Sequence, residues 1–176
     1  MSSEPQPMRV MKGNLAGTMT EGFVMGVLST LCMSVWMLLA NRMTPVKQPD
    51  PLPPEEITRH LTEKLKVDDQ LSDSQQKKLS LFNHFLYGGL LALPLVLFRP
   101  SSTAKKSVSQ GMIYALGVWF SNYYGLLPVL KLYPSAKHEP ARMNGIMIVA
   151  HLIWGSTLGL FLGPGHYVVQ RSKVYQ

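Results

Sequence analysis

Residues 146–162 read IMIVAHLIWGSTLGLFL, and residues 86–98 read LYGGLLALPLVLF. Neither stretch has polar side chains at every third or fourth position, as the solvent-facing side of a helix in a soluble protein would. An α-helix rises about 1.5 Å per residue and the hydrocarbon layer is about 30 Å thick, so about 20 uncharged residues suffice to cross it. These two stretches therefore predict membrane-spanning helices.

The charged residues lie outside four long stretches of the chain. Of the 176 residues only 15 % are charged, and the mean hydropathy is slightly positive. The stretches without Asp, Glu, Lys or Arg are Gly22–Asn41, Leu79–Phe98, Ser107–Leu130 and Met143–Gln170. We predict an all-α fold, a polytopic membrane protein whose four-transmembrane-helix bundle has spans at about 22–41, 79–98, 107–130 and 143–163.

The net charge of +7 does not indicate a nucleic-acid-binding protein. The basic residues stand at the ends of the predicted spans, as Arg42, Lys77 and Lys131 do, and form no cluster with interleaved aromatic residues. Their placement suits lipid headgroups. Cys32 is the only cysteine and falls inside the first span, so no intrachain disulfide is expected.

The extramembrane parts are short except for the loop 44–78. We place a four-helix membrane domain at 13–170, a flexible N-terminal tail at 1–12 and a C-terminal tail at 171–176. The two later loops are short, so consecutive helices should be antiparallel neighbours, and an even number of spans puts both termini on the same side.

The loop 44–78 contains a pattern typical of a helix start. Prolines precede Glu55 and Glu56, and Ile57, Leu61 and Leu65 follow at intervals of four residues. This predicts a short interfacial amphipathic helix near 54–66, whose apolar stripe packs against the membrane surface or the bundle end, or binds a partner helix. Ser72 and Gln75 have the spacing of a capping box and predict a second helix start.

Small residues recur at intervals of about four in the spans. In lipid this spacing lets two helix backbones approach closely, either within the monomer or between copies. We favour packing within the monomer. The helix-packing residues predicted in this way are Gly22, Gly26, Gly117, Ser121, Gly125, Gly155, Gly159 and Gly163.

Polar side chains interrupt the apolar spans at three places. They form a candidate intramembrane cluster of His84, Asn122, Tyr123 and His151. Polar groups at membrane depth are costly unless they face protein or water, so we expect them in the bundle interior. Hydrogen bonds between helices are the favoured role for the two histidines, with Asn122, Tyr123 or Tyr124 as partners; a proton relay and a metal site are the alternatives.

Signatures of enzymes and metal sites are missing from the sequence. There is no Gly-x-Ser-x-Gly, no His-Glu-x-x-His, no phosphate-binding glycine loop and no acidic pair within a span. We therefore predict no catalytic residue, no metal and no cofactor. A further cluster, His138, Glu139 and Arg142, is predicted to be a solvated salt-bridge group at the membrane interface.

The order of several motifs resembles a known group of proteins. These motifs are Pro-Pro-Glu-Glu-Ile at 53–57, Phe-x-Tyr-Gly at 85–88, His-Glu-Pro at 138–140 and His-Leu-Ile-Trp-Gly at 151–155. The chain is similar over roughly 20–163 to small uncharacterised bacterial inner-membrane proteins with four spans, and distantly to YagU-like proteins. The resemblance implies a multi-pass location in the cell membrane, in bacteria the inner membrane, and supplies no reaction.

For function we expect a non-enzymatic membrane bundle that acts through contacts, as an accessory, stress-related or partner-binding protein. The alternative is a small transporter or channel subunit that uses the His84, Asn122 and His151 cluster, and a membrane-embedded enzyme ranks third. The expected partners are the lipid bilayer and other membrane proteins or further copies of the chain, and not nucleic acid.

Overall fold

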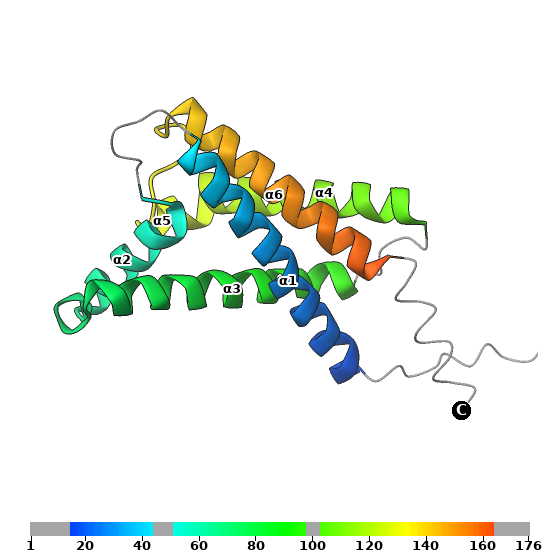
Figure 1. Ribbon diagram of the computed structural model, residues 1–176, viewed down its shortest axis with the longest axis horizontal. Helices are drawn as coiled ribbons and strands as arrows, with labels where there is room; N and C mark the ends of the chain where they lie inside the picture. Colours follow the sequence, from blue (N-terminus) through cyan, green and yellow to red (C-terminus); the bar gives the residue numbers. More distant parts are fainter. Residues whose placement is uncertain (1–14, 44–50, 98–102, 164–176) are drawn as a thin grey trace, which may run out of the picture.

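The computed structural model describes residues 15–43, 51–97 and 103–163, and in these ranges the chain is helical without a strand (Figure 1). The predicted tails at 1–12 and 171–176 lie outside the described residues. The helices in chain order are α1 (Leu15–Arg42), α2 (Pro53–Leu65), the 3₁₀ turn η1 (Asp68–Gln70), α3 (Asp73–Leu97), α4 (Ala104–Ser121), the π-helical η2 (Asn122–Leu126), α5 (Leu127–Val129) and α6 (Ala141–Leu162).

Three helices are long and apolar enough to cross a membrane: α1, α3 and α6. The all-α fold is thus confirmed, and three of the four predicted spans coincide with helices that are long and apolar enough to cross a membrane. The fourth predicted stretch, 107–130, is divided among α4, η2 and α5, because a π-helical turn interrupts it after Ser121. Helices also extend beyond the uncharged stretches; α1 begins at Leu15 and not near residue 22.

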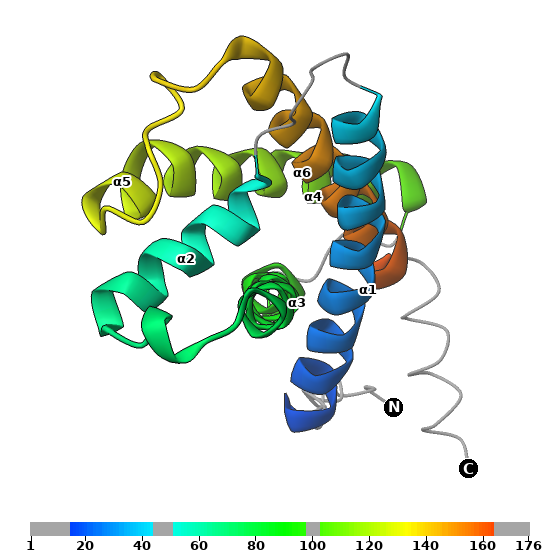
Figure 2. The same cartoon turned by 60° about the vertical axis from the view of Figure 1, so that its left-hand side comes forward.

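In Figure 1, α1 and α6 run diagonally across α3 and α4, and in Figure 2 α3 is seen end-on while α1 and α4 lie across the view, so the four long helices cross rather than share one axis. α1 packs against α3 and against α6, α4 packs against α6, and α3 and α4 scarcely touch. Figure 2, seen nearly along α3, shows α2 and α5 beside the space between α3 and α4. The described chain ends, at the start of α1 and the end of α6, lie at the opposite end of the bundle from α2 (Figure 1).

Small residues allow close packing of α4 on α6 and of α1 on α3. A Cβ placed on Gly155 of α6 would lie 2.3 Å from the Gly111 carbonyl oxygen of α4, and one on Gly159 would lie 2.4 Å from the Ser107 carbonyl oxygen. On α1, a Cβ on Gly26 would lie 2.5 Å from Ala92 of α3. Helix backbones can approach this closely only where glycine leaves out the Cβ atom.

Not every predicted packing residue has this role. Gly22 and Gly163 have close neighbours in another helix, Val96 and Ser107 respectively. By contrast, a Cβ on Gly117 or Gly125 would meet nothing within 4 Å, and Ser121 is exposed. Packing within the monomer is therefore wrong for these three residues, because the face of α4 that meets α6 carries other small residues.

The predicted helix in the first loop exists as α2, Pro53–Leu65, and the residue that follows it, Lys66, adopts the left-handed conformation, φ 58°. Ile57 and Leu61 are half-buried, as expected for the apolar stripe. Leu65 is 63 % exposed, so the stripe is one turn shorter than predicted. The capping box before α3 is confirmed, since the Ser72 N–H donates to Gln75 Oε1 at 2.8 Å.

Candidate functional site

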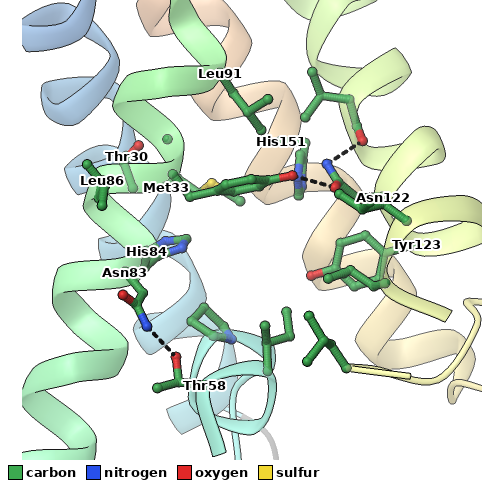
Figure 3. Close-up of a pocket in the computed structure, with 18 of the residues that line it drawn as sticks. Thr30, Met33, Thr58, Asn83, His84, Leu86, Leu91, Asn122, Tyr123 and His151 are labelled. Carbon is green, nitrogen blue, oxygen red and sulfur yellow. Dashed lines mark hydrogen bonds between the residues drawn. The ribbon is translucent and has the colours of Figure 1, made fainter. Parts of the chain in front are cut away.

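A cavity of about 370 Å³ lies between α3 and α4, where these two helices fail to meet. Its walls come from α1, α3, α6 and the segment from the end of α4 through α5, and α2 forms one end with Pro54, Ile57, Thr58 and Leu61. Figure 3 shows the space with α3 on one side and Asn122 and Tyr123 on the other. The volume is at the lower end of the range of small-molecule sites, about 300–1,000 Å³.

The cavity occupies the half of the bundle next to α2. Its α1 lining begins at Thr30, and its α6 lining ends at Trp154. Among the described residues, 104–117 of α4 and 155–162 of α6 contribute nothing to the walls. In that other half the glycine contacts bring α4 and α6 together. The cavity is therefore a one-sided pocket.

The sequence-predicted polar cluster meets in this cavity. His84 from α3, Asn122 and Tyr123 from η2, and His151 from α6 all line it (Figure 3). They are set among Leu, Met and other apolar side chains, and no Asp, Glu, Lys or Arg belongs to the lining that the described residues form. The cavity is a largely apolar pocket with a few polar atoms.

The π-helical turn positions Asn122 toward the cavity. In η2 the backbone N–H of Leu127 donates to the Asn122 carbonyl, one residue further back than in an α-helix. Pro128 follows; it has no N–H and its ring would clash with the carbonyl four residues earlier, so a regular α-helix cannot continue here. π-Helical turns often occur at functional sites.

Asn122 links two walls of the cavity. Its Oδ1 accepts a hydrogen bond from the Tyr87 hydroxyl of α3 at 2.6 Å, and its Nδ2 donates to the Val118 carbonyl at 2.9 Å. A second tyrosine bridge, from the Tyr114 hydroxyl to the Leu91 carbonyl at 2.6 Å, joins α4 to α3. These two bonds connect the helices that do not pack directly.

His151 is buried, and its own helix holds its ring. The Nδ1 atom lies 2.8 Å from the Met147 carbonyl oxygen, which can only accept, so Nδ1 carries the proton. In the neutral ring Nε2 is then an acceptor. The Tyr123 ring meets the imidazole edge-on, with centroids 6.1 Å apart. The expected bond from His151 to a neighbouring helix is thus not found; a carbonyl one turn earlier takes its place.

His84 lines the α3 side of the cavity, across from Asn122 and Tyr123 (Figure 3). Its Nε2 atom is buried and has no hydrogen-bond partner in the described part of the chain. The prediction of a bond from His84 to Asn122 or Tyr123 is therefore wrong. Asn122 Oδ1 accepts from the Tyr87 hydroxyl instead, and the Tyr123 hydroxyl donates to the Met147 sulfur. A buried polar atom without a partner costs about 1–3 kcal/mol.

Two threonines complete the polar lining, and sequence reasoning missed both. The Thr30 hydroxyl donates to the Gly26 carbonyl and accepts from Trp154 Nε1 at 3.1 Å, which joins α1 to α6. The Thr58 hydroxyl of α2 accepts from the Asn83 amide at 3.5 Å. Threonine is common both in apolar helices such as α1 and in amphipathic ones such as α2, so the sequence contained no signal for either.

The predicted interface cluster lies outside the cavity, where the chain enters α6. His138 is exposed, Glu139 and Arg142 are half-buried, and Arg142 belongs to the first turn of α6. Burial, together with the nearby Glu139 carboxylate, raises the pKa of the Tyr133 phenol. No group of three metal-ligating side chains occurs in the ranges 15–43, 51–97 and 103–163.

The chain belongs to a family of unknown function, DUF6789, whose family model matches residues 16–167. The prediction of an uncharacterised family is thereby confirmed. No curated protein and no solved structure matches the chain. The matched range includes all the residues that line the cavity.

Proposed function

We propose that this chain is a non-enzymatic, multi-pass membrane protein that acts by binding, and that its cavity holds a small apolar molecule. The cavity between α3 and α4 is the observation that carries the proposal. A pocket lined mostly by apolar side chains with a few placed polar groups is the usual form of a small-molecule site. Binding suits the accessory, stress-related or partner-binding roles that the sequence suggested.

Four spans are part of this proposal. The segment α4–η2–α5 runs through residues 104–129 without leaving a helical conformation, and at about 1.5 Å per residue it is long enough to cross the hydrocarbon layer. In Figure 1 it runs from right to left, opposite to the left-to-right course of α3 and α6, as a fourth span would, although Figure 2 shows that it crosses α3 at a large angle. A location in a bacterial inner membrane and a distant relationship to YagU-like proteins complete the proposal.

Labelling of single cysteines tests the four spans. With Cys32 replaced by Ser, we expect Asp69→Cys, in the segment before α3, and Lys137→Cys, before α6, to react with a membrane-impermeant maleimide from the same side. Both positions are exposed. Reaction from opposite sides would show that the segment 104–129 does not cross.

The alternative is a small transporter or channel subunit. His84, Asn122 and His151 line the cavity, as that role requires. However, the lining ends at Trp154 on α6 and at Thr30 on α1, and the described residues 155–162 and 16–29 do not contribute to it. A pocket that ends halfway favours binding over conduction, so binding is the leading proposal.

Photolabelling tests the binding function directly. The reconstituted protein is irradiated with a small uncharged aryl diazirine, and labelled peptides are mapped by mass spectrometry. We expect label on Tyr87 and Met147, and loss of that label in Val118→Trp, which fills the cavity from α4. The matched control Ile113→Trp lies on the same helix at a residue that is 72 % exposed and does not line the cavity. Equal labelling of both variants would exclude an occupied cavity.

A further inference from the structure

We propose that the molecule in the cavity is a neutral amphipath with a hydroxyl group. This hydroxyl donates a hydrogen bond to His151 Nε2, and the apolar part of the molecule extends out of the cavity between α3 and α4. This inference rests on the proposed binding function and adds the chemical class of the ligand. Three features of the cavity support it: its charge, its free polar atoms and the position of its opening.

The lining excludes a charged ligand. No Asp, Glu, Lys or Arg of the described chain contributes to it. A carboxylate, phosphate or ammonium group in this apolar space would have no counter-charge, and an unpaired charge in such surroundings costs far more than a single hydrogen bond returns. The polar end of the ligand is therefore uncharged.

The polar atoms require a donor on the ligand. Most polar side chains of the lining are already paired: Asn122 with Tyr87, Thr30 with Trp154, and Thr58 with Asn83. The bond from Nδ1 to the Met147 carbonyl leaves His151 Nε2 as a hydrogen-bond acceptor within a side chain that is 92 % buried. A ligand hydroxyl would donate to that acceptor. Its oxygen could also accept a hydrogen bond from His84, whose Nε2 has no partner in the described chain.

The opening lies on an apolar part of the outer surface. Four leucines line the cavity and are also exposed on the outer surface; they are Leu86 and Leu90 of α3 and Leu126 and Leu130 near α5. Residues that belong both to the cavity wall and to the outer surface mark its mouth. Because α2 covers the neighbouring end of the bundle with Ile57 and Leu61, the mouth between the leucines is the way in for an apolar molecule.

A matched pair of probes tests the proposal in nanodiscs of neutral phospholipid. One is a long-chain alcohol with a diazirine in its chain, and the other is its methyl ether, which has the same body and no donor. A hydrogen bond of about 0.5–1.5 kcal/mol predicts roughly 2- to 12-fold stronger labelling of cavity peptides by the alcohol. His151→Phe should abolish the difference between the two probes, and Val118→Trp should block both.

The source of the hydroxyl is resolved by competition. A diacylglycerol in the bilayer and a simple phenol added from the water are tested against the alcohol probe. Displacement by either supports the proposal and identifies the source as a lipid or a free small molecule; displacement by neither overturns it.

The results separate this inference from the binding function. Equal labelling of the cavity by alcohol and ether in the unaltered protein would overturn the hydroxyl proposal and leave the binding function intact. Failure of both probes, and of the aryl diazirine, to label the cavity would overturn both. The comparison of the two probes needs no variant, so it stands even if His151→Phe does not fold.

Discussion

The contact between Gly155 and Gly111 makes a strong prediction about stability. A Cβ on Gly155 would lie 2.3 Å from the Gly111 carbonyl oxygen and 2.6 Å from the Ala115 Cβ. Ordinary contacts are about 3.5 Å or longer, so Gly155→Ala must push α4 away by roughly 1 Å. Overpacking costs about 1–3 kcal/mol, with the upper end expected because backbone atoms cannot rotate away. The higher helix propensity of Ala returns about 1 kcal/mol, which leaves a net loss of about 1–2 kcal/mol.

Gly117→Ala is the matched control on the same helix pair. A Cβ there would meet nothing within 4 Å, so only the gain in helix propensity remains. We expect this variant to be more stable than the unaltered protein by up to about 1 kcal/mol. The same chemical change should thus shift the free energy of unfolding in opposite directions at the two glycines.

The assay is reversible unfolding in mixed micelles with an increasing fraction of SDS, followed by far-ultraviolet circular dichroism. The two variants are compared with the unaltered protein under the same conditions. If Gly155→Ala were as stable as Gly117→Ala, the close approach of α4 to α6 would not exist in the folded protein, and the packing argument would fail.

Three smaller effects can be measured with the same material. Ser107→Ala removes the bond from its hydroxyl to the Gly159 carbonyl, 2.6 Å, and should lower the free energy of unfolding by about 0.6 kcal/mol in the SDS titration. Gln75→Ala removes half of the capping box and should cost about 0.5–2 kcal/mol, seen as faster amide exchange in the first turn of α3. The raised pKa of Tyr133 means that the folded state holds the phenolic proton more tightly than the unfolded state, so stability should fall as the pH rises above about 10. In Tyr133→Phe this alkaline loss should be smaller, and an equal loss in both proteins would contradict the assignment.

The helices could be predicted from the sequence, because absence of charge is a property of the chain itself. The sequence could not show which of the small residues pack against another helix. On α4, the set Ser107, Gly111 and Ala115 and the set Gly117 and Ser121 both recur every four residues. The two sets lie on different faces, since two positions correspond to about 200° around a helix. Only the arrangement of α6 in space decides that the first set is the contact face.

The sequence predicted which residues form the candidate polar cluster, but not which hydrogen bonds they make. Polar groups in apolar spans face the interior, and His84, Asn122, Tyr123 and His151 do line one cavity. Their partners depend on backbone geometry that no periodicity reveals. The π-helical turn rotates Asn122 toward Tyr87, and the Met147 carbonyl of its own helix accepts the hydrogen bond from His151 Nδ1.

The cavity follows from how unequally the four long helices attract one another. Glycines draw α1 onto α3 and α4 onto α6, and Trp36 Nε1, which donates to the Ile146 carbonyl, ties α1 to α6. Between α3 and the α4–η2 segment the described contacts are of another kind. The side chains of Tyr87 and Tyr114 span the gap, and each forms its hydrogen bond through the hydroxyl at the end of its ring. A tyrosine that bonds at its tip holds two backbones apart by the length of its ring, whereas a pair of glycines brings them together. The space between α3 and α4 is therefore specified by hydrogen bonds that keep it open.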